Sequence, residues 1–223
     1  MKKVSIIIPV KNGANYLGEA LEAIRNQGLD VEVIVVDDNS DDKTSAIAQK
    51  YGCTLIHHAE TKGQSVGKNT GLKYATGQFV LFHDHDDVLT PDALATLCQP
   101  LEHNPDAMVV MAKAKDFLSP DAKNRKSKIK EAPYFGFLSG AMLFRRAIFD
   151  IIGPCSEKTT AGETIDLTNR LMKHHINIHR LDCITVMRRI HDTNFGITHR
   201  SREYGDYAKL LRERLKVKRK FEP

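Results

Sequence analysis

The sequence has few cysteines and no long hydrophobic run. Its four cysteines are far apart and form no C-x-x-C pair, which argues against a zinc ribbon or a dense disulfide framework and favours buried thiols in a reducing compartment. The apolar run near the N-terminus spans only a few residues, too short for the core of a signal peptide. No window approaches the roughly 20 apolar residues of a membrane span. We therefore expect a cytoplasmic protein.

A large excess of one sign of charge is also absent. Lysine plus arginine exceeds aspartate plus glutamate by 33 − 28 = 5, and this small positive balance points to no class of partner. The chain has 223 residues, of which 41% are hydrophobic, and it shows no internal repeat or low-complexity segment. A chain of this length and composition can bury a sizeable core, so we expect one large domain.

The first half of the chain alternates short apolar runs with segments of helical spacing. The apolar runs are rich in β-branched residues and mostly continuous in apolar character, which suits strands covered on both faces. They lie at 4–10, 31–36, 53–58 and 78–83. The first helical segment lies at about 17–24, and the third at about 65–75. The second begins at Ser40 or Asp41, either of which is a possible N-cap, and the fourth follows Thr90-Pro91. This alternation predicts a parallel, doubly wound sheet with right-handed crossovers.

After about residue 106 the pattern changes. The segment 135–149 is apolar and contains Gly136, Ser139 and Gly140, which mark a turn or a close approach of two backbones. The other elements expected here are a strand at 107–117, a polar basic loop at 119–133, a helix at 163–174, strands at 177–181 and 184–190, and a charged helix at about 201–216.

Acidic residues gather where strands of the predicted sheet end. Asp37 and Asp38 follow the second strand, and Asp84, Asp86 and Asp87 follow the fourth. Ligands of open α/β sheets bind beyond the carboxyl ends of the strands. Hard divalent ions such as Mg²⁺ or Mn²⁺ prefer carboxylate oxygens, often shared with the phosphates of a nucleotide. The alternative is a solvated turn whose aspartates cap the next helix, but the shared sheet edge favours a metal site.

Three segments carry a resemblance to a known family. They read VSIIIPVKNGANYLGEALEAIRNQ, VEVIVVDDNSDDKT and KGQSVGKNTGLKYATGQFVLFHDHDDVLTPDAL. In this order and spacing they resemble the first half of the inverting family 2 glycosyltransferases, which are hexosyltransferases with the GT-A fold. The resemblance is dense over residues 3–100 and looser over 135–195.

The resemblance implies a fold and its division. The fold class is α/β, of the GT-A type, with a doubly wound, mostly parallel sheet flanked by helices in a single domain over 1–223. Within this domain we expect a Rossmann-like nucleotide-sugar-binding half at 1–105, a mixed acceptor half at 106–200, and a basic C-terminal helix at 201–223.

The resemblance also implies a site for a nucleotide sugar, usually a UDP-sugar. The matching positions are the loop beside the nucleobase, an aspartate that contacts the base, a basic residue of the third helix, and a D-x-D-D motif that contacts ribose and holds a divalent metal. They are Pro9, Val10 and Asn12; Asp38; Lys68; and Asp84, Asp86 and Asp87. Lys68 stands where the family usually has arginine, so the planar fork is lost. The metal, Mn²⁺ or Mg²⁺ on Asp86, would act as a Lewis acid on the leaving diphosphate.

An inverting transfer also needs a base near the acceptor hydroxyl. In AGETIDLTNRLMKHH the family's base is commonly the aspartate after the glutamate, and here that position is Thr164. Glu163 or Asp166 could serve instead, and Glu163 is adjacent to the matched position. Acids near the start of a helix are also favoured without any catalytic role. A nucleotide-sugar-binding protein with weak or no transferase activity is therefore the alternative function.

The segment VMRRIHDTN resembles the strand and loop, often of R-x-H form, that closes the family's site. His191 could approach the metal or the diphosphate, although a lone histidine is more often structural. Arg188 and Arg189 point to opposite faces of one strand, so at most one of them would reach the pyrophosphate.

The C-terminal tail suggests one kind of partner, and two missing sequence patterns argue against other functions. RERLKVKRK, at 212–220, holds six basic residues in nine. This tail suits peripheral contact with an anionic membrane, where a lipid-linked or other saccharide acceptor would lie, or plain exposure to solvent. No aromatic interleaving supports nucleic-acid binding. A nucleotidyltransferase would need a Gly-rich phosphate loop after the first strand, and KNGANYLGEA is a poor match.

Overall fold

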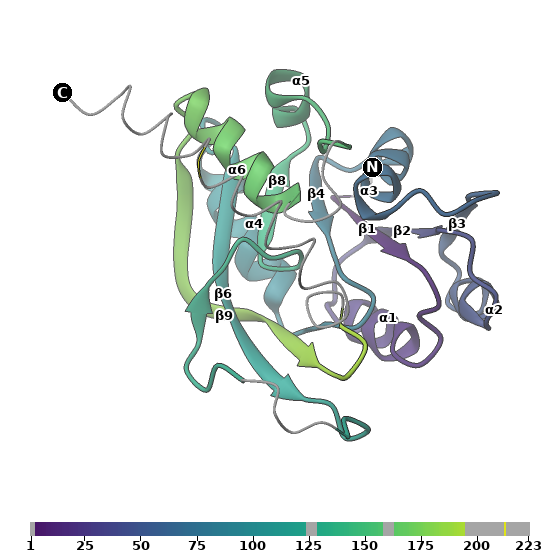
Figure 1. Cartoon of the computed structure of the whole chain (residues 1–223). Helices are drawn as coiled ribbons and strands as arrows, with labels where there is room; N and C mark the ends of the chain where they lie inside the picture. The colour runs from purple at the N-terminus through teal and green to yellow at the C-terminus, as the bar shows by residue number, and fades with distance from the viewer. Residues whose placement is uncertain (1–2, 124–128, 158–162, 195–211, 213–223) are drawn as a thin grey trace.

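The computed structural model describes residues 3–123, 129–157, 163–194 and 212, and it shows one mixed sheet with helices on both sides (Figure 1). The strands are β1 Val4–Val10, β2 Val31–Asp37, β3 Thr54–His57, β4 Phe79–Phe82, β5 Val88–Leu89, β6 Val109–Leu118, β7 Tyr134–Phe135, β8 Met142–Arg145 and β9 Ile178–Ile190. The helices are α1 Leu17–Arg25, α2 Thr44–Lys50, α3 Gln64–Tyr74, α4 Ala93–His103, α5 Ile148–Ile152 and α6 Glu163–Lys173.

The strand order determines where the sheet can receive a ligand. The order is β3-β2-β1-β4-β8-β6-β9-β5, with β7 paired to β6. β1 pairs in parallel with β2 on one side and with β4 on the other, and β2 pairs in parallel with β3. The chain thus leaves β1 in one direction and later returns to its other side, which makes the gap between β1 and β4 a topological switch point. The predicted doubly wound, parallel first half is confirmed.

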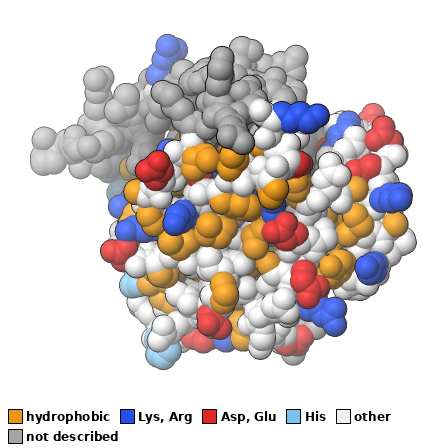
Figure 2. All heavy atoms as spheres, turned by 90° about the horizontal axis from the view of Figure 1, so that it is seen from below, with side chains coloured by type: hydrophobic (Ala, Val, Ile, Leu, Met, Phe, Trp, Pro, Cys, Tyr) orange, Lys and Arg blue, Asp and Glu red, His pale blue; other side chains and the backbone are white. Residues whose placement is uncertain are grey.

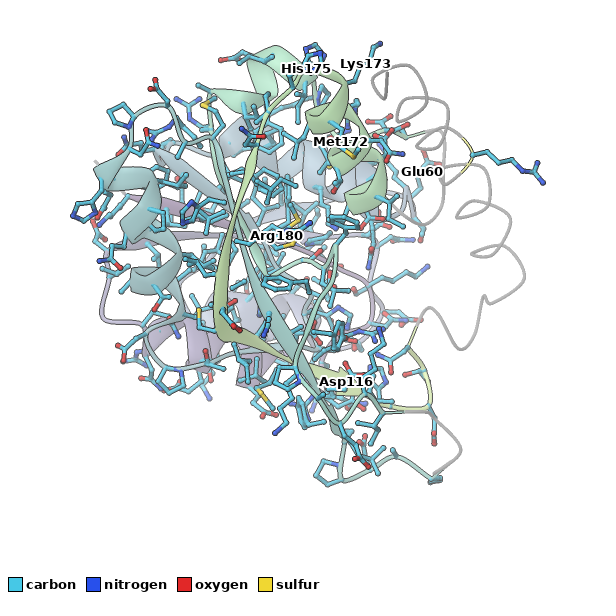
Figure 3. All side chains as sticks on the ribbon, turned by 90° about the vertical axis from the view of Figure 1, so that its left-hand side faces the viewer. Glu60, Asp116, Met172, Lys173, His175 and Arg180 are labelled. Atoms are coloured by element: carbon cyan, nitrogen blue, oxygen red, sulfur yellow. The ribbon has the colours of Figure 1, made fainter. Side chains whose placement is uncertain are left out.

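The second half of the sheet is mixed and is joined to the first half through β8. β8 lies antiparallel between β4 and β6, and β6 pairs in parallel with the long strand β9. The two strands predicted at 177–181 and 184–190 are a single strand, because a shift of register near Lys113 lets β9 keep its pairing with β6. Arg180 on β9 and Asp116 on β6 mark two points along this pair in Figure 3.

Residues of β1 contribute to two separate hydrophobic cores. Ile6 and Ile8 belong to a cluster that includes Leu17 of α1 and Leu94 of α4. Ile7 belongs to another cluster, which includes residues of α5 and α6. Since successive side chains of a strand point to opposite faces, a strand covered on both faces needs a continuous apolar sequence. This is the reason for the uninterrupted run in β1.

The predicted start of α2 is wrong. The helix begins at Thr44, and neither Ser40 nor Asp41 caps it. The hydroxyl of Ser40 instead accepts a hydrogen bond from the backbone N–H of Asn12 (2.9 Å), and the N–H of Asp41 donates to Asn12 Oδ1 (3.0 Å). These polar residues join the loop after β2 to the loop after β1, a long-range role that local sequence cannot reveal.

The predicted start of α4 is also displaced. The helix begins at Ala93, after Asp92 in a left-handed conformation with φ of 59°. Thr90 does not cap it, because its hydroxyl donates to the carbonyl of Ile184 on β9 (2.9 Å). Thr90 therefore ties the segment after β5 to the middle of the long strand β9.

The surface and the remaining helices add two observations. Acidic and basic side chains are interspersed around hydrophobic ones on the face shown in Figure 2. In the part of the chain that the structure describes, no helix has the length and apolar character needed to cross a membrane. The charged helix predicted at 201–216 lies outside the described residues except for position 212.

Helix α3 rests directly on the backbone and side chains of β1. A Cβ added at Gly67 would lie 2.7 Å from Pro9 Cβ, and one at Gly71 would lie 2.3 Å from Ile7 Cγ2. Real Cβ atoms do not approach other carbons this closely, so the two glycines permit the short separation between helix and strand. This contact fixes α3 against the switch point.

We expect Gly71→Ala to lower the free energy of unfolding by about 1–3 kcal/mol, because overpacking must push α3 from β1. Gly18→Ala is the matched control within α1, since its added Cβ would have no neighbour closer than 4.0 Å. The control should raise stability by roughly 0.5–1 kcal/mol. Urea denaturation followed by circular dichroism measures both. Unchanged stability of Gly71→Ala would contradict the close packing.

Candidate nucleotide-sugar site

The loops that follow β1 and β4 meet at the switch point. Pro9 and Val10 end β1, and Asn12 follows them in a left-handed conformation with φ of 54°. A Cβ added at Gly13 would lie 2.6 Å from Cδ2 of His85 in the D-x-D-D loop. The structure therefore brings the predicted nucleobase loop against the predicted diphosphate loop.

Asp38 lies just beyond β2, and other groups of the protein already occupy most of the hydrogen-bonding positions of its carboxylate. Its Oδ1 accepts hydrogen bonds from His58 Nδ1 and from the N–H of Lys62, and its Oδ2 accepts one from the N–H of Gly63, all at 2.8 Å. Burial alone would raise the pKa of Asp38, but the His58 and backbone hydrogen bonds outweigh it and lower the pKa. His58 Nε2 lies 3.0 Å from Thr70 Oγ1 of α3. The histidine thus connects Asp38 to the helix that rests on β1.

Asp84, the first of the three motif aspartates, has a buried carboxylate that is only partly satisfied by its neighbours. Its Oδ1 is buried and has no hydrogen-bond partner among the described residues. Burial raises the pKa of Asp84, the ammonium of Lys68 opposes that rise, and the carboxylates of Asp86 and Glu163 add to it. A buried acceptor without a donor is costly unless a ligand completes it. Asp84 is therefore poised to accept a cation or a donor group.

Asp86 is compensated by a histidine from the end of the chain's last described strand. Its Oδ2 lies 2.9 Å from His191 Nε2, and Nδ1 of the same histidine lies 2.9 Å from Thr193 Oγ1. Burial would raise the pKa of Asp86, but the contact with His191 lowers it. His191 thus lies at the motif, where its contact is with a carboxylate; its approach to a metal or a diphosphate stays a prediction.

Hydrogen bonds of Asp87 and Arg189 hold the turn of the D-x-D-D motif against β9. Asp87 is 4% exposed, and its Oδ1 accepts a hydrogen bond from the N–H of Arg189 (2.9 Å). The side chain of Arg189 donates from Nε to the carbonyl of Asp86 (2.9 Å). Burial and the neighbouring carboxylates raise the pKa of Asp87 well above its ordinary value. Arg188 lies near Asp116 instead, with Nη1 3.9 Å from Oδ1, so the arginine pair divides between two sites as strand geometry requires.

Lys68 joins the two halves of the protein from within. It is 1% exposed and donates hydrogen bonds to Glu163 Oε1 (2.5 Å) and to Ser139 Oγ (2.9 Å). Burial would lower the pKa of Lys68, but Glu163 and Asp84 raise it above its ordinary value. Burial would raise the pKa of Glu163, and the ion pair with Lys68 lowers it. Both groups are therefore charged in the folded protein.

Asp166, the second candidate base, has a different environment from that of Glu163. Its Oδ2 accepts a hydrogen bond from Nε of Arg170 (3.0 Å), one turn along α6, and lies 2.8 Å from Nη2 of the same arginine in an ion pair. Arg170 also donates to the carbonyl of Gly153 (3.1 Å). Asp166 thus helps to join α6 to the end of α5, whereas Glu163 contacts the lysine of the donor half.

The carboxylates at the motif fit a divalent cation that is shared with a ligand. Across residues 3–123, 129–157 and 163–194, no three His, Cys, Asp or Glu side chains converge into a complete metal site. Asp84 and Asp86 nevertheless supply hard oxygen donors, and Asp84 Oδ1 is unsatisfied. Ions such as Mg²⁺ commonly take one or two carboxylates and complete their shell with phosphate oxygens and water. The donor set therefore fits a cation bound together with a diphosphate.

A sheet with a switch point, lined by acidic strand-end loops, defines a nucleotide-binding α/β protein. Residues 5–156 match the family described as glycosyl transferase family 2. The chain belongs to this family, as the resemblance of its three segments implied.

Named relatives include enzymes that are much longer than the matched stretch. The chain is 39% identical over 109 residues to the GalNAc(5)-diNAcBac-PP-undecaprenol beta-1,3-glucosyltransferase of Campylobacter jejuni, over 44% of this chain and 34% of that protein. It is 36% identical over 122 residues to the poly(ribitol-phosphate) beta-N-acetylglucosaminyltransferase TarS of Staphylococcus aureus, over 51% of this chain and 21% of that protein. The matched stretches thus span about a third or less of these relatives.

Solved structures share the fold over nearly the whole chain. A structure of S. aureus TarS in complex with UDP-GlcNAc has a TM-score of 0.71 and 25% identity, covering 96% of this chain and 66% of that one. The mannosyltransferase PcManGT of Pyrobaculum calidifontis, in complex with GDP-Man and Mn²⁺, has a TM-score of 0.72 and 18% identity, covering 100% and 65%. The predicted GT-A fold is confirmed.

The contacts of three residues that organise this site were not predicted from the sequence. His58, Ser139 and Arg189 hold Asp38, Lys68 and the motif turn respectively. His58 stands at a strand end, where its position could have suggested a role. The contacts of Ser139 and Arg189 join segments 71 and 103 residues apart, and no local pattern signals them.

Asp38 should contribute to the loss of the free energy of unfolding as the pH falls into the acid range. Because its pKa is lower in the folded protein than the ordinary 3.8, its contribution is full above about pH 4 and is lost as pH falls through the folded pKa. We expect Asp38→Asn to destabilise the protein at pH 6 and the difference from wild type to narrow toward pH 3. Urea titrations at each pH measure it, with the exposed Asp106→Asn as control. A difference that is independent of pH would contradict this assignment.

Proposed function

We propose that the protein is a metal-dependent, inverting glycosyltransferase that moves a sugar from a UDP-sugar to an acceptor hydroxyl. The observation that carries the proposal is the shared sheet edge where Asp38 follows β2 and Asp84 and Asp86 follow β4, with Glu163 bound to Lys68 near Asp84. Donor-binding carboxylates and a carboxylate of the acceptor half are the groups that such a transfer requires.

The hydrogen bonds of Asp38 favour uracil as the base. A carboxylate offers about four acceptor positions, and His58, Lys62 and Gly63 use three of them. One position remains, on Oδ2, which suits the single N3–H of uracil better than the adjacent N1–H and N2–H₂ of guanine. The TarS structure with UDP-GlcNAc, at 25% identity, supports the same choice over the GDP-Man complex at 18%.

The diphosphate would lie at the D-x-D-D loop. Asp84 and Asp86 would hold a divalent cation, Mn²⁺ or Mg²⁺, which supplies Lewis-acid stabilisation to the leaving diphosphate. Asp87 and Arg189 keep the turn in place, and Pro9, Val10 and Asn12 would line the nucleobase. The ammonium of Lys68 would add positive charge near the diphosphate.

Glu163 is the better candidate for the base. The acceptor hydroxyl oxygen would form a bond to the anomeric carbon while the bond from that carbon to the diphosphate oxygen breaks on the opposite face, which inverts the configuration. Glu163 would take the hydroxyl proton, and its carboxylate is already ionised in this structure, where it pairs with Lys68. Asp166 is held by Arg170 beside α5, so we assign it the secondary role.

We propose a saccharide or lipid-linked acceptor for this reaction. The names of two relatives describe acceptors that contain phosphate, PP-undecaprenol and poly(ribitol-phosphate). The basic segment 201–223 suits peripheral contact with an anionic membrane from the cytoplasmic side. We propose no nucleic-acid partner.

A nucleotide-sugar-binding protein without transfer activity is the second candidate. Two observations favour it: Thr164 stands where the family commonly has its base, and Glu163 is 8% exposed and paired with Lys68. Donor binding without turnover over a broad panel of acceptors would support this candidate over the transferase.

The metal role of Asp86 can be measured by calorimetry of UDP binding with and without Mn²⁺. Asp86→Ala should weaken Mn²⁺-dependent binding by about tenfold or more, because the cation loses a carboxylate ligand. Asp106→Ala, at an exposed position, should bind as wild type does. Equal affinities of Asp86→Ala and wild type in Mn²⁺ would refute the metal site, and preference for GDP would refute the donor assignment.

The base assignment can be tested by transfer kinetics. Glu163→Gln should lower kcat by about 10²–10⁴ while UDP binding is retained, since general-base catalysis contributes that much. Asp166→Asn should lower kcat far less, because it loses only a helix-surface ion pair. A larger loss for Asp166→Asn than for Glu163→Gln would reverse the assignment.

A further inference from the structure

The buried ammonium of Lys68 lies at the meeting point of three segments. It projects from α3, and its two hydrogen bonds go to Ser139, in the loop before β8, and to Glu163, the first residue of α6. The three segments are far apart in sequence, with separations of 71 and 95 residues between the bonded pairs. α3 and α6 lie on the same side of the sheet in Figure 1. Lys68 is therefore a single cation shared by both halves of the fold.

The carboxylates of Glu163 and Asp84 both interact with the ammonium of Lys68. Glu163 is bound to it directly, and Asp84 of the D-x-D-D motif is close enough to affect its charge state. Asp84 Oδ1 has no hydrogen-bond partner in the described structure, and two of the three ammonium protons already have acceptors. In a region of low dielectric, an anion that arrives beside Asp84 would compete strongly with Glu163 for the ammonium.

Ser139 would keep Lys68 in place if Glu163 moved away. The adjacent Gly140 adopts φ of 78°, and a Cβ there would lie 2.8 Å from Nδ1 of the fully buried His83 at the end of β4. The loop that carries Ser139 is thus packed against the strand that leads into the D-x-D-D motif. The hydroxyl acceptor is fixed relative to the donor site, whereas Glu163 belongs to the start of a separate helix.

We propose that the diphosphate of the donor and Glu163 compete for the ammonium of Lys68, so that donor binding releases Glu163 to the acceptor. This inference rests on the proposed function, because it requires a nucleoside diphosphate at the D-x-D-D loop. Before the donor binds, Glu163 is held by Lys68 and Ser139 receives the second hydrogen bond. After it binds, the ammonium turns toward the diphosphate, and Glu163 becomes free to accept the proton of the acceptor hydroxyl.

A double-mutant cycle on UDP affinity tests the competition without any transfer assay. Glu163→Gln removes the competing charge and should tighten UDP binding by about threefold to tenfold, as expected for a close charge pair. Lys68→Met should weaken binding, and Glu163→Gln should then have no effect in the Lys68→Met background. Asp150→Asn removes an equal charge from the neighbouring α5 at an exposed position, and it should leave the affinity within twofold of wild type.

The outcomes separate this inference from the proposed function. If wild type binds neither UDP nor GDP, the proposed function fails and the competition fails with it. If wild type binds UDP but Glu163→Gln binds it no more tightly, or tightens equally with and without Lys68, only the competition is overturned. Lys68→Met leaves Glu163 buried without its partner and can fail to fold. The double variant removes both charges, and the proposal then requires it to bind UDP at least about tenfold more weakly than Glu163→Gln.

Discussion

The close packing of α3 on β1 is the constraint on which the site depends. Gly67 and Gly71 let the helix approach Pro9 and Ile7 without intervening side chains. Only at this separation does Lys68, next to Gly67, reach Ser139 and Glu163 on the other half of the sheet. A bulkier residue at either glycine would therefore alter the arrangement of charges around Lys68 as well as the core.

The acidic motif is stabilised from outside the nucleotide half. Arg189 holds the carbonyl of Asp86 and also pairs with Glu19 of α1 at 2.5 Å, while His191 compensates the carboxylate of Asp86. Clustered carboxylates repel one another unless opposite charge is nearby. Basic groups of β9 and its following loop thus lie beside the motif and reduce the repulsion among its carboxylates.

Local sequence predicted the strands and the acidic clusters at the strand ends because each depends on a short pattern. The run in β1 is apolar on both faces, and Asp84, Asp86 and Asp87 follow a buried strand, so a continuous apolar run and a strand-end position were enough. The start of α2 was mispredicted because Ser40 and Asp41 bond to Asn12, 28 and 29 residues away. The burial of Lys68 could not be predicted for the same reason, since its partners come from β8's loop and α6. Long-range polar contacts leave no periodic signal in the chain.

The pairing of β9 has a consequence for how proteins of this family can diversify. β9 lies between β6 and β5, and β5 follows the D-x-D-D motif directly. β9 and the loop after it therefore supply Arg189 and His191 to the D-x-D-D turn. Recombination that exchanged the second half of the sheet as a module would exchange these supports too, so new ligand preferences are more readily gained through loops than through replacement of that half.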